Sequence, residues 1–256
     1  MLLRGLIAVL AVTSTLAVCN ISKSIALPVT DSSSSSQVAA KPSPQVQLIQ
    51  VLSGHANSVN SVVLSPDGKT VISSSTDSTM KLWNLKDGSQ LRTVWSLPRV
   101  TTVLAITPDG GTLVSGSSGT ERSIKIWDLR TRKLQQTILG QAGEIYAIAI
   151  SPNGQTFAAT IDKNVRIWDF RSGKELHSLT AHSSKVLAIA FSPDGETIAS
   201  AGSDQSIKLW DLDSGKLLHT LTGHSGWIWS IAISPDGQTL VSGSDDNTVR
   251  IWSASR

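Results

Sequence analysis

Short runs of alternating apolar and polar residues, separated by turn residues, extend over most of this chain. Near the C-terminus the residues from Trp227 to Ile233 alternate and end at the turn Ser234-Pro235-Asp236-Gly237. Two β-branched runs follow, Thr239 to Ser242 and Thr248 to Trp252, with Ser244-Asp245-Asp246-Asn247 between them. Such runs and turns are typical of antiparallel strands joined by hairpins. We find no helical period in them.

The same unit is repeated five times. Five Trp residues, each preceded by a short apolar run, follow one another at intervals of 44, 41, 42 and 42 residues: Trp83, Trp127, Trp168, Trp210 and Trp252. A further strand is predicted ahead of a repeat, as at Lys216 to Leu221. Units of four short strands with a period near 42 are typical of a β-propeller. We therefore predict an all-β propeller of five four-stranded blades over residues 47–256.

Three motifs recur in register with these strands. They are Gly-His, as at Gly223-His224, Trp-Asp, as at Trp210-Asp211, and Ser-Pro-Asp-Gly between units. Over about residues 47–256 the chain resembles the WD-repeat family. That resemblance implies a hydrogen-bonded tetrad of His, Ser or Thr, Asp and Trp in each blade, in which buried polar groups satisfy one another around a carboxylate. Its members are His55, Ser73, Asp77 and Trp83; His182, Ser200, Asp204 and Trp210; and His224, Ser242, Asp246 and Trp252.

The second and third repeats depart from the tetrad. In the second, Leu97 stands at the His place and Glu121 at the Asp place. In the third, Gln141 replaces His and either Ala158 or Ala159 replaces Ser. We expect these two adjacent blades to be the least rigid.

The two ends of the repeat region match each other. Residues 47–52 align with Lys216 to Leu221, an outer strand, and no outer strand follows Trp252. We therefore expect residues 47–52 to complete the last blade and close the ring, which would leave no strand edge open. WD-repeat proteins usually have seven blades, sometimes six or eight, so two alternatives stay open. The five blades form an open arc, or two chains complete each other as a homo-oligomer.

The resemblance also implies where a protein or peptide partner binds. In the family, partners often dock on the face near the starts of the inner strands. The residues expected to form this docking face are Tyr146, Leu187, Trp227 and Trp229, edged by Glu144 and Lys185, with Asp245 just before a tetrad Asp. Trp and Tyr are favoured at the centres of interfaces, which supports this interpretation. The alternative is that the two Trp residues pack between blades.

The N-terminus is typical of a secretory signal peptide. One basic residue, Arg4, precedes the uncharged and mostly apolar run from Gly5 to Val18. As a helix this run would extend only about 21 Å, against roughly 30 Å for a bilayer core, so a membrane-spanning anchor is disfavoured. The small residues of Ser24-Ile25-Ala26 predict cleavage after Ala26. Residues 1–26 are therefore interpreted as a signal peptide.

A lipoprotein is the competing interpretation of this segment. Leu16-Ala17-Val18-Cys19 resembles a bacterial lipobox, although Val18 stands where Gly, Ala or Ser is usual. Acylation of Cys19 would anchor the chain to a lipid surface. The Ser- and Pro-rich residues 27–46 are predicted to form a flexible linker. We therefore expect an exported protein, periplasmic or secreted, or lipid-anchored through Cys19.

The charge and the candidate reactive residues exclude several classes of function. The formal charge of +3 falls to +1 without residues 1–26, and the remaining charges are scattered, so no basic footprint for nucleic acid is visible. Three of the five His residues belong to tetrads, and no spacing suggests a metal or cofactor site. We predict a non-catalytic exported scaffold that binds a protein or peptide. The alternative is a propeller whose central pocket binds or hydrolyses a small molecule or glycan, which rests on analogy with other propellers.

Overall fold

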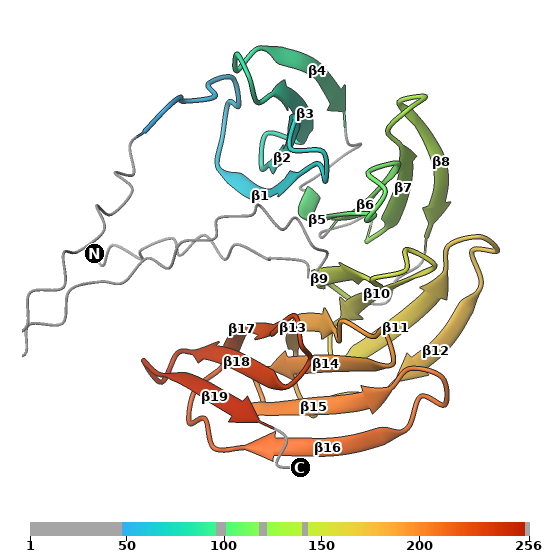
Figure 1. Ribbon diagram of the computed structural model, residues 1–256, viewed down its shortest axis with the longest axis vertical. Coiled ribbons are helices and arrows are strands. Elements are labelled where there is room, and N and C mark those ends of the chain that lie inside the picture. Colours follow the sequence, from blue (N-terminus) through green and yellow to red (C-terminus); the bar gives the residue numbers. More distant parts are fainter. Residues whose placement is uncertain (1–47, 96–100, 118–121, 140–142, 254–256) are drawn as a thin grey trace, which may run out of the picture.

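The computed structural model describes residues 48–95, 101–117, 122–139 and 143–253. Nineteen β-strands and no helix occur in these ranges, and the strands form five consecutive antiparallel sheets (Figure 1). The predicted all-β architecture of five repeated blades is confirmed. The signal peptide, Cys19, the linker, Leu97, Glu121 and Gln141 lie outside the described residues. In the described part of the chain no helix is long and apolar enough to cross a membrane.

Each blade is built from strands that follow one another in the sequence. Blade 1 contains β1 (Val59–Leu64), β2 (Thr70–Ser75), β3 (Thr79–Asn84) and β4 (Gln90–Trp95). Blade 2 contains β5 (Thr101–Ile106), β6 (Thr112–Ser117), β7 (Ile124–Asp128) and β8 (Lys133–Ile138). Blade 3 contains β9 (Ile145–Ile150), β10 (Thr156–Ile161), β11 (Asn164–Asp169) and β12 (Glu175–Leu179). Blade 4 contains β13 (Val186–Phe191), β14 (Thr197–Gly202), β15 (Ser206–Asp211) and β16 (Leu217–Thr222). Blade 5 contains β17 (Ile228–Ile233), β18 (Thr239–Ser244) and β19 (Val249–Ser253).

The Ser-Pro-Asp-Gly turns fix the first hairpin of a blade. In blade 1 the Ser65 hydroxyl donates to the Asp67 carboxylate at 2.5 Å, and the same carboxylate accepts the Lys69 amide at 3.0 Å. Gly68 has φ 68°, a left-handed conformation that Gly adopts without steric cost. The Thr70 amide then bonds back to the Ser65 hydroxyl at 2.9 Å. The turn residues read from the sequence therefore set where β1 ends and β2 begins.

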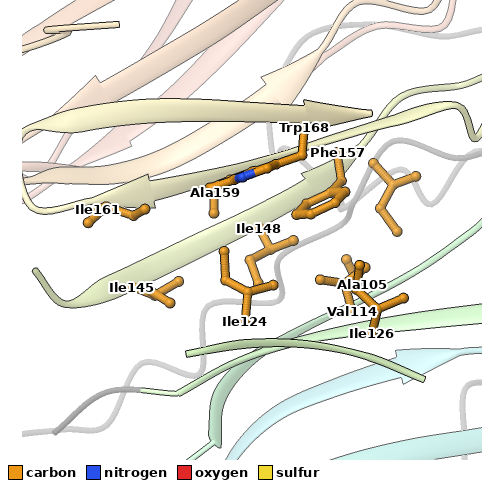
Figure 2. Packing of buried hydrophobic residues seen from close by; sticks show 11 residues of the cluster. Ala105, Val114, Ile124, Ile126, Ile145, Ile148, Phe157, Ala159, Ile161 and Trp168 are labelled. Carbon is orange, nitrogen blue, oxygen red and sulfur yellow. The ribbon is translucent and has the colours of Figure 1, made fainter. Parts of the chain in front are cut away.

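The hydrophobic core is divided among the junctions between neighbouring blades. Four clusters of buried residues lie between blades 1 and 2, 2 and 3, 3 and 4, and 4 and 5. Figure 2 shows the cluster between blades 2 and 3, where Ile124 and Ile126 of β7 face Ile145 and Ile148 of β9. In the described residues no such cluster joins blade 5 to blade 1. The blades are therefore stacked along an arc, each depending on its neighbours.

Closure of the ring by residues 47–52 is not observed. Blade 5 is a three-stranded sheet, and residues 48–52 are not a strand, whereas Gln47 lies outside the described residues. The Gln50 side chain instead donates to the backbone carbonyl of Asp87 at 2.7 Å, which holds this segment against the β3–β4 turn of blade 1. Blades 1 and 5 lie at opposite ends of the arc (Figure 1), and in this structure residues 48–52 contact blade 1 and do not pair with β19.

Candidate functional site

The tetrad of blade 1 is a continuous hydrogen-bonded chain from β3 across β2 to the loop before β1. The Trp83 indole donates to the Ser73 hydroxyl at 2.8 Å, and Ser73 is 2.7 Å from Nε2 of His55. Nδ1 of His55 lies 2.8 Å from the Asp77 carboxylate. Because an indole N–H only donates and a carboxylate only accepts, Ser73 donates to Nε2 and Nδ1–H donates to Asp77.

The structure brings together the other two tetrads in the same way. In blade 4, His182 is 2.8 Å from Ser200 and 2.9 Å from Asp204, and the Trp210 indole donates to Ser200 at 3.0 Å. In blade 5 the corresponding contacts are 2.8 Å for His224 with Ser242, 2.7 Å for His224 with Asp246 and 2.9 Å for Trp252 with Ser242. His182 and His224 are buried. These twelve residues therefore tie the strands of blades 1, 4 and 5 together.

Each complete tetrad contains a further hydroxyl that was not predicted from the sequence. Thr79 and Thr248 donate to the tetrad carboxylates of their blades at 2.6 Å, and Ser206 does so at 2.8 Å. Each stands two residues after the tetrad Asp, so its recurrence at that spacing was the available signal. A backbone amide also donates to each carboxylate, as Ser183 does to Asp204 at 3.1 Å.

These donors keep the tetrad carboxylates charged. Burial alone would raise the pKa of Asp77, but hydrogen bonds from Thr79, the Ala56 amide and His55 together lower it well below its usual range. Burial would likewise raise the pKa of Asp204, but hydrogen bonds from His182, Ser206 and the Ser183 amide, with the charge interaction with His182, together lower it. The pKa of His182 is lowered mainly by its burial, which favours the neutral imidazole. In each complete tetrad a carboxylate thus orients the His ring through Nδ1, an arrangement suited to structure.

Blade 2 retains only half of a tetrad in its described residues. The Trp127 indole donates to the Ser115 hydroxyl at 2.9 Å, as in the complete tetrads. Ser123, at the place of Thr79, pairs with the Ser117 hydroxyl at 3.0 Å. Trp127 is only half-buried, whereas Trp210 is 6% exposed. Trp127 therefore contributes less buried surface than Trp210.

Blade 3 replaces the polar tetrad by an aromatic stack. Ala159 pairs with Arg166 as Ser73 pairs with Lys81, so Ala159 occupies the Ser place. Trp168 lies on Phe157 with ring centroids 5.1 Å apart and planes 13° apart. Figure 2 shows the two rings together above the blade 2–3 cluster, and both are buried. In blade 3 the position of the repeat Trp is thus fixed by ring stacking, whereas in the complete tetrads it is fixed by a hydrogen bond to Ser.

A β-bulge near the start of the inner strand shapes the face expected to bind a partner. The pairing register skips one residue between Val186 and Ala188 and between Ile228 and Ser230, which leaves Leu187 and Trp229 outside the ladder. In blade 3 the register shifts opposite Tyr146, where the Thr160 hydroxyl accepts the Tyr146 amide at 3.3 Å. Bulges redirect side chains and are frequent near functional sites. The alternation of apolar and polar residues in these inner strands does not indicate the bulges.

Two aromatic side chains of blade 5 are exposed on this face. Trp227 and Trp229 are 46% and 39% exposed, and their ring centroids are 5.7 Å apart at an angle of 51°. The Trp229 indole donates to the carboxylate of the exposed Asp245 at 2.7 Å, which fixes the orientation of its ring. In this structure, where the described residues place no blade after blade 5, neither ring is packed between blades.

A second group on the face joins blades 3 and 4. The Tyr146 hydroxyl donates to the Glu144 carboxylate at 2.6 Å, and Nζ of Lys185 lies 5.1 Å from the centre of the Tyr146 ring. Lys185 is also 4.0 Å from Glu144. Burial and the bond to Glu144 raise the pKa of Tyr146, so the phenol is protonated at neutral pH. The group presents one aromatic ring between an acid and a base.

Leu187 differs from the rest of the expected face. Its side chain is only 7% exposed, although it stands between the two aromatic groups in sequence and in the order of blades. It is therefore not presented to a partner in this structure. In the described residues no three or more His, Cys, Asp or Glu side chains gather where they could hold a metal ion.

Comparison with known proteins identifies the repeats. The family described as "WD domain, G-beta repeat" matches residues 46–84, 91–128, 132–169, 173–211 and 215–253. This chain belongs to the WD-repeat family. The WD-repeat propeller is a typical scaffold for protein interactions, is generally non-catalytic, and generally binds protein partners.

Individual relatives match only short parts of this WD-repeat chain. An uncharacterized WD repeat-containing protein of Synechocystis, sll1491, is 38% identical over 72 residues, which are 28% of this chain and 21% of that protein. Eukaryotic translation initiation factor 3 subunit I of Aspergillus fumigatus is 37% identical over 63 residues, which are 25% of this chain and 18% of that protein. The chain thus spans about a fifth of the length of these relatives, and their activities are not transferred to it.

Proposed function

We propose that this protein is a non-catalytic WD-repeat scaffold that binds a protein or peptide through the docking face formed by Glu144, Tyr146, Lys185, Trp227, Trp229 and Asp245. The observation that supports it most directly is the exposed pair Trp227 and Trp229. The five repeat Trp residues, in contrast, are all buried or half-buried. An exposed aromatic pair with a fixed orientation provides contact area at little entropic cost, which is typical of an interface.

The double substitution Trp227→Ala/Trp229→Ala is expected to abolish binding of the partner and leave the fold intact. Both rings lie largely outside the core, so their loss removes contact surface more than packing. The full chain and the double variant would be immobilised and exposed to an extracytoplasmic extract, after thermal melts have shown that both are folded. A protein retained by the parent and lost by the variant would then be purified and its binding to both measured.

A matched control uses two exposed residues of an outer strand. Leu217 and Leu218 of β16 are 46% and 48% exposed, and Leu217→Ala/Leu218→Ala removes similar apolar surface away from the docking face. It is expected to retain the partner. If the Trp variant retains the same proteins as the parent, the docking face is wrong. A small-molecule or glycan screen would then test the alternative of a ligand-binding central pocket.

We further propose that the scaffold acts outside the cytoplasm. The charged start at Arg4, the apolar run to Val18 and the small residues up to Ala26 support export, with residues 27–46 as a linker. Expressed in a bacterial host and recovered from the extracytoplasmic fraction, the chain is expected to begin at Leu27. A chain beginning at an acylated Cys19, and losing its lipid on Cys19→Ser, would establish the lipoprotein instead. Intact Met1 in the cytoplasmic fraction would contradict export.

A further inference from the structure

The inner strand of blade 1 exposes apolar side chains at places that are more buried in the blades that follow. Leu64, the last residue of β1, is 39% exposed. The last residues of β5, β9 and β13, which are Ile106, Ile150 and Phe191, are at most 5% exposed. Two places earlier, Val62 is 41% exposed, whereas Leu104 and Ile148 are at most 3% exposed. The face of β1 is therefore open, and in the described residues no blade packs against it.

The opposite end of the arc is uncovered as well. Val249 and Ile251 of β19 are 70% and 74% exposed. Val249 pairs with Gly243 of β18 as Ile207 pairs with Ala201 in blade 4, and Ile207 is fully buried. The edge of β19 has no fourth strand in the described residues. An open apolar edge of this kind pairs readily with another strand.

The segment before β1 is already placed as an outer strand would be. Gln136 of the outer strand of blade 2 lies against Gly173 of blade 3, so close that a Cβ added at Gly173 would be 2.5 Å from the Gln136 side chain. His177 of the outer strand of blade 3 lies against Gly215 of blade 4 in the same way, at 2.9 Å from such an atom. Gln50 lies in the same manner against Gly88 of blade 1, within 1.8 Å of such an atom. Residues 48–52 thus occupy the position, relative to blade 1, of the outer strand of a preceding blade.

We propose that a second copy of this chain joins the two ends, so that residues 48–52 of one copy pair antiparallel with β19 of the next. The face of β1 then packs on blade 5 of that copy. The register follows from blade 4, where Ile207 pairs with Leu221 and Lys208 with Thr220. By the same spacing Val249 faces Leu52, and Arg250 faces Val51.

The placement of the segment favours a second copy over closure within one chain. Leu48, Ile49 and Val51 are 81%, 90% and 69% exposed, so their apolar surface is free to pair. Within one chain β19 lies at the far end of the arc (Figure 1), whereas β19 of another copy can approach without moving Gln50 from blade 1. Strand addition supplies main-chain hydrogen bonds, and a head-to-tail contact of this type allows two or more copies to assemble.

Sedimentation equilibrium of the full chain over a range of concentrations tests the proposal. The expected mass is at least twice the 27.1 kDa of one chain. Ile251→Glu should weaken association at least about tenfold, because it places a charge in the paired edge. Leu218→Glu, at a similarly apolar exposed place on β16, should leave it unchanged. A parent that remains monomeric at every concentration would overturn the proposal.

Disulfide trapping separates the two ways of joining the ends. Val51→Cys in one copy and Arg250→Cys in another, both with Cys19→Ser, are mixed and oxidised. The proposed register brings these positions into disulfide range and predicts a covalent dimer. Leu176→Cys in place of Val51→Cys should give none. If both cysteines in one chain form a disulfide within the monomer, and the mixture forms no dimer, closure within one chain replaces the proposal.

Discussion

Trp210→Ala is expected to lower the free energy of unfolding by about 3–5 kcal/mol, as truncation of a large buried aromatic residue does. Trp210 is 6% exposed and packs in the cluster between blades 3 and 4 with Phe191 and Ile198. Its indole also donates to Ser200, which is fully buried and is left with one partner fewer. The loss therefore combines a cavity with a damaged tetrad. Urea denaturation monitored by far-UV circular dichroism measures it.

Trp127→Ala provides the comparison and is expected to cost less. Trp127 donates to Ser115 in the same manner, but its side chain is only half-buried. Removing it takes away less buried surface. The variants share one residue type and one place in the repeat, so the difference isolates burial and the completeness of the tetrad. Equal losses for Trp210→Ala and Trp127→Ala would show that the complete tetrad confers no extra stability.

Most of the architecture was predictable because the repeat carries several independent signals. The period set by the Trp residues, the Ser-Pro-Asp-Gly turns and the short β-branched runs agree on the same strand boundaries. The tetrads were predictable through the resemblance to the WD-repeat family, which implies that Ser73, Asp77 and Trp83 bond with His55, and a buried His needs such partners. Local chemistry that recurs in register is readable from one chain.

The parts that could not be predicted depend on contacts between segments. The bulge that puts Trp229 outside the ladder is set by the pairing of β17 with β18, and nothing in the alternation of β17 indicates it. Leu187 occupies the same place on β13 and is only 7% exposed, so the place in the repeat does not decide exposure. Ring closure depends on the curvature accumulated over all blades. Alignment of residues 47–52 with an outer strand contains no information on that curvature.

Blade 3 shows how the fold tolerates loss of a tetrad. Low rigidity was expected there because Gln141 stands at the His place and Ala158 or Ala159 at the Ser place. The structure instead has Phe157, whose place in blades 2 and 5 holds Leu113 and Leu240, stacked on Trp168. A tetrad satisfies the buried indole by hydrogen bonds, whereas the stack gains from apolar contact. With Ala159 at the Ser place, Trp168 is held by ring stacking, whereas the Trp residues of the complete tetrads are held by a hydrogen bond to Ser. The loss of the tetrad therefore does not by itself make blade 3 weaker.

Phe157→Ala is expected to cost about 3–5 kcal/mol of unfolding free energy, of which about 0.5–1.5 kcal/mol reflects the aromatic pairing itself. The Phe157 side chain is fully buried and contacts both Trp168 and Phe170, the latter with ring centroids 4.8 Å apart. Phe157→Leu retains apolar volume and should cost only about 1.5 kcal/mol or less. Urea denaturation of both variants measures the difference. If Phe157→Leu, which keeps apolar volume and removes the aromatic pairing, costs nothing, the stack does not stabilise blade 3, and its stability depends on the remaining contacts of the blade 2–3 cluster.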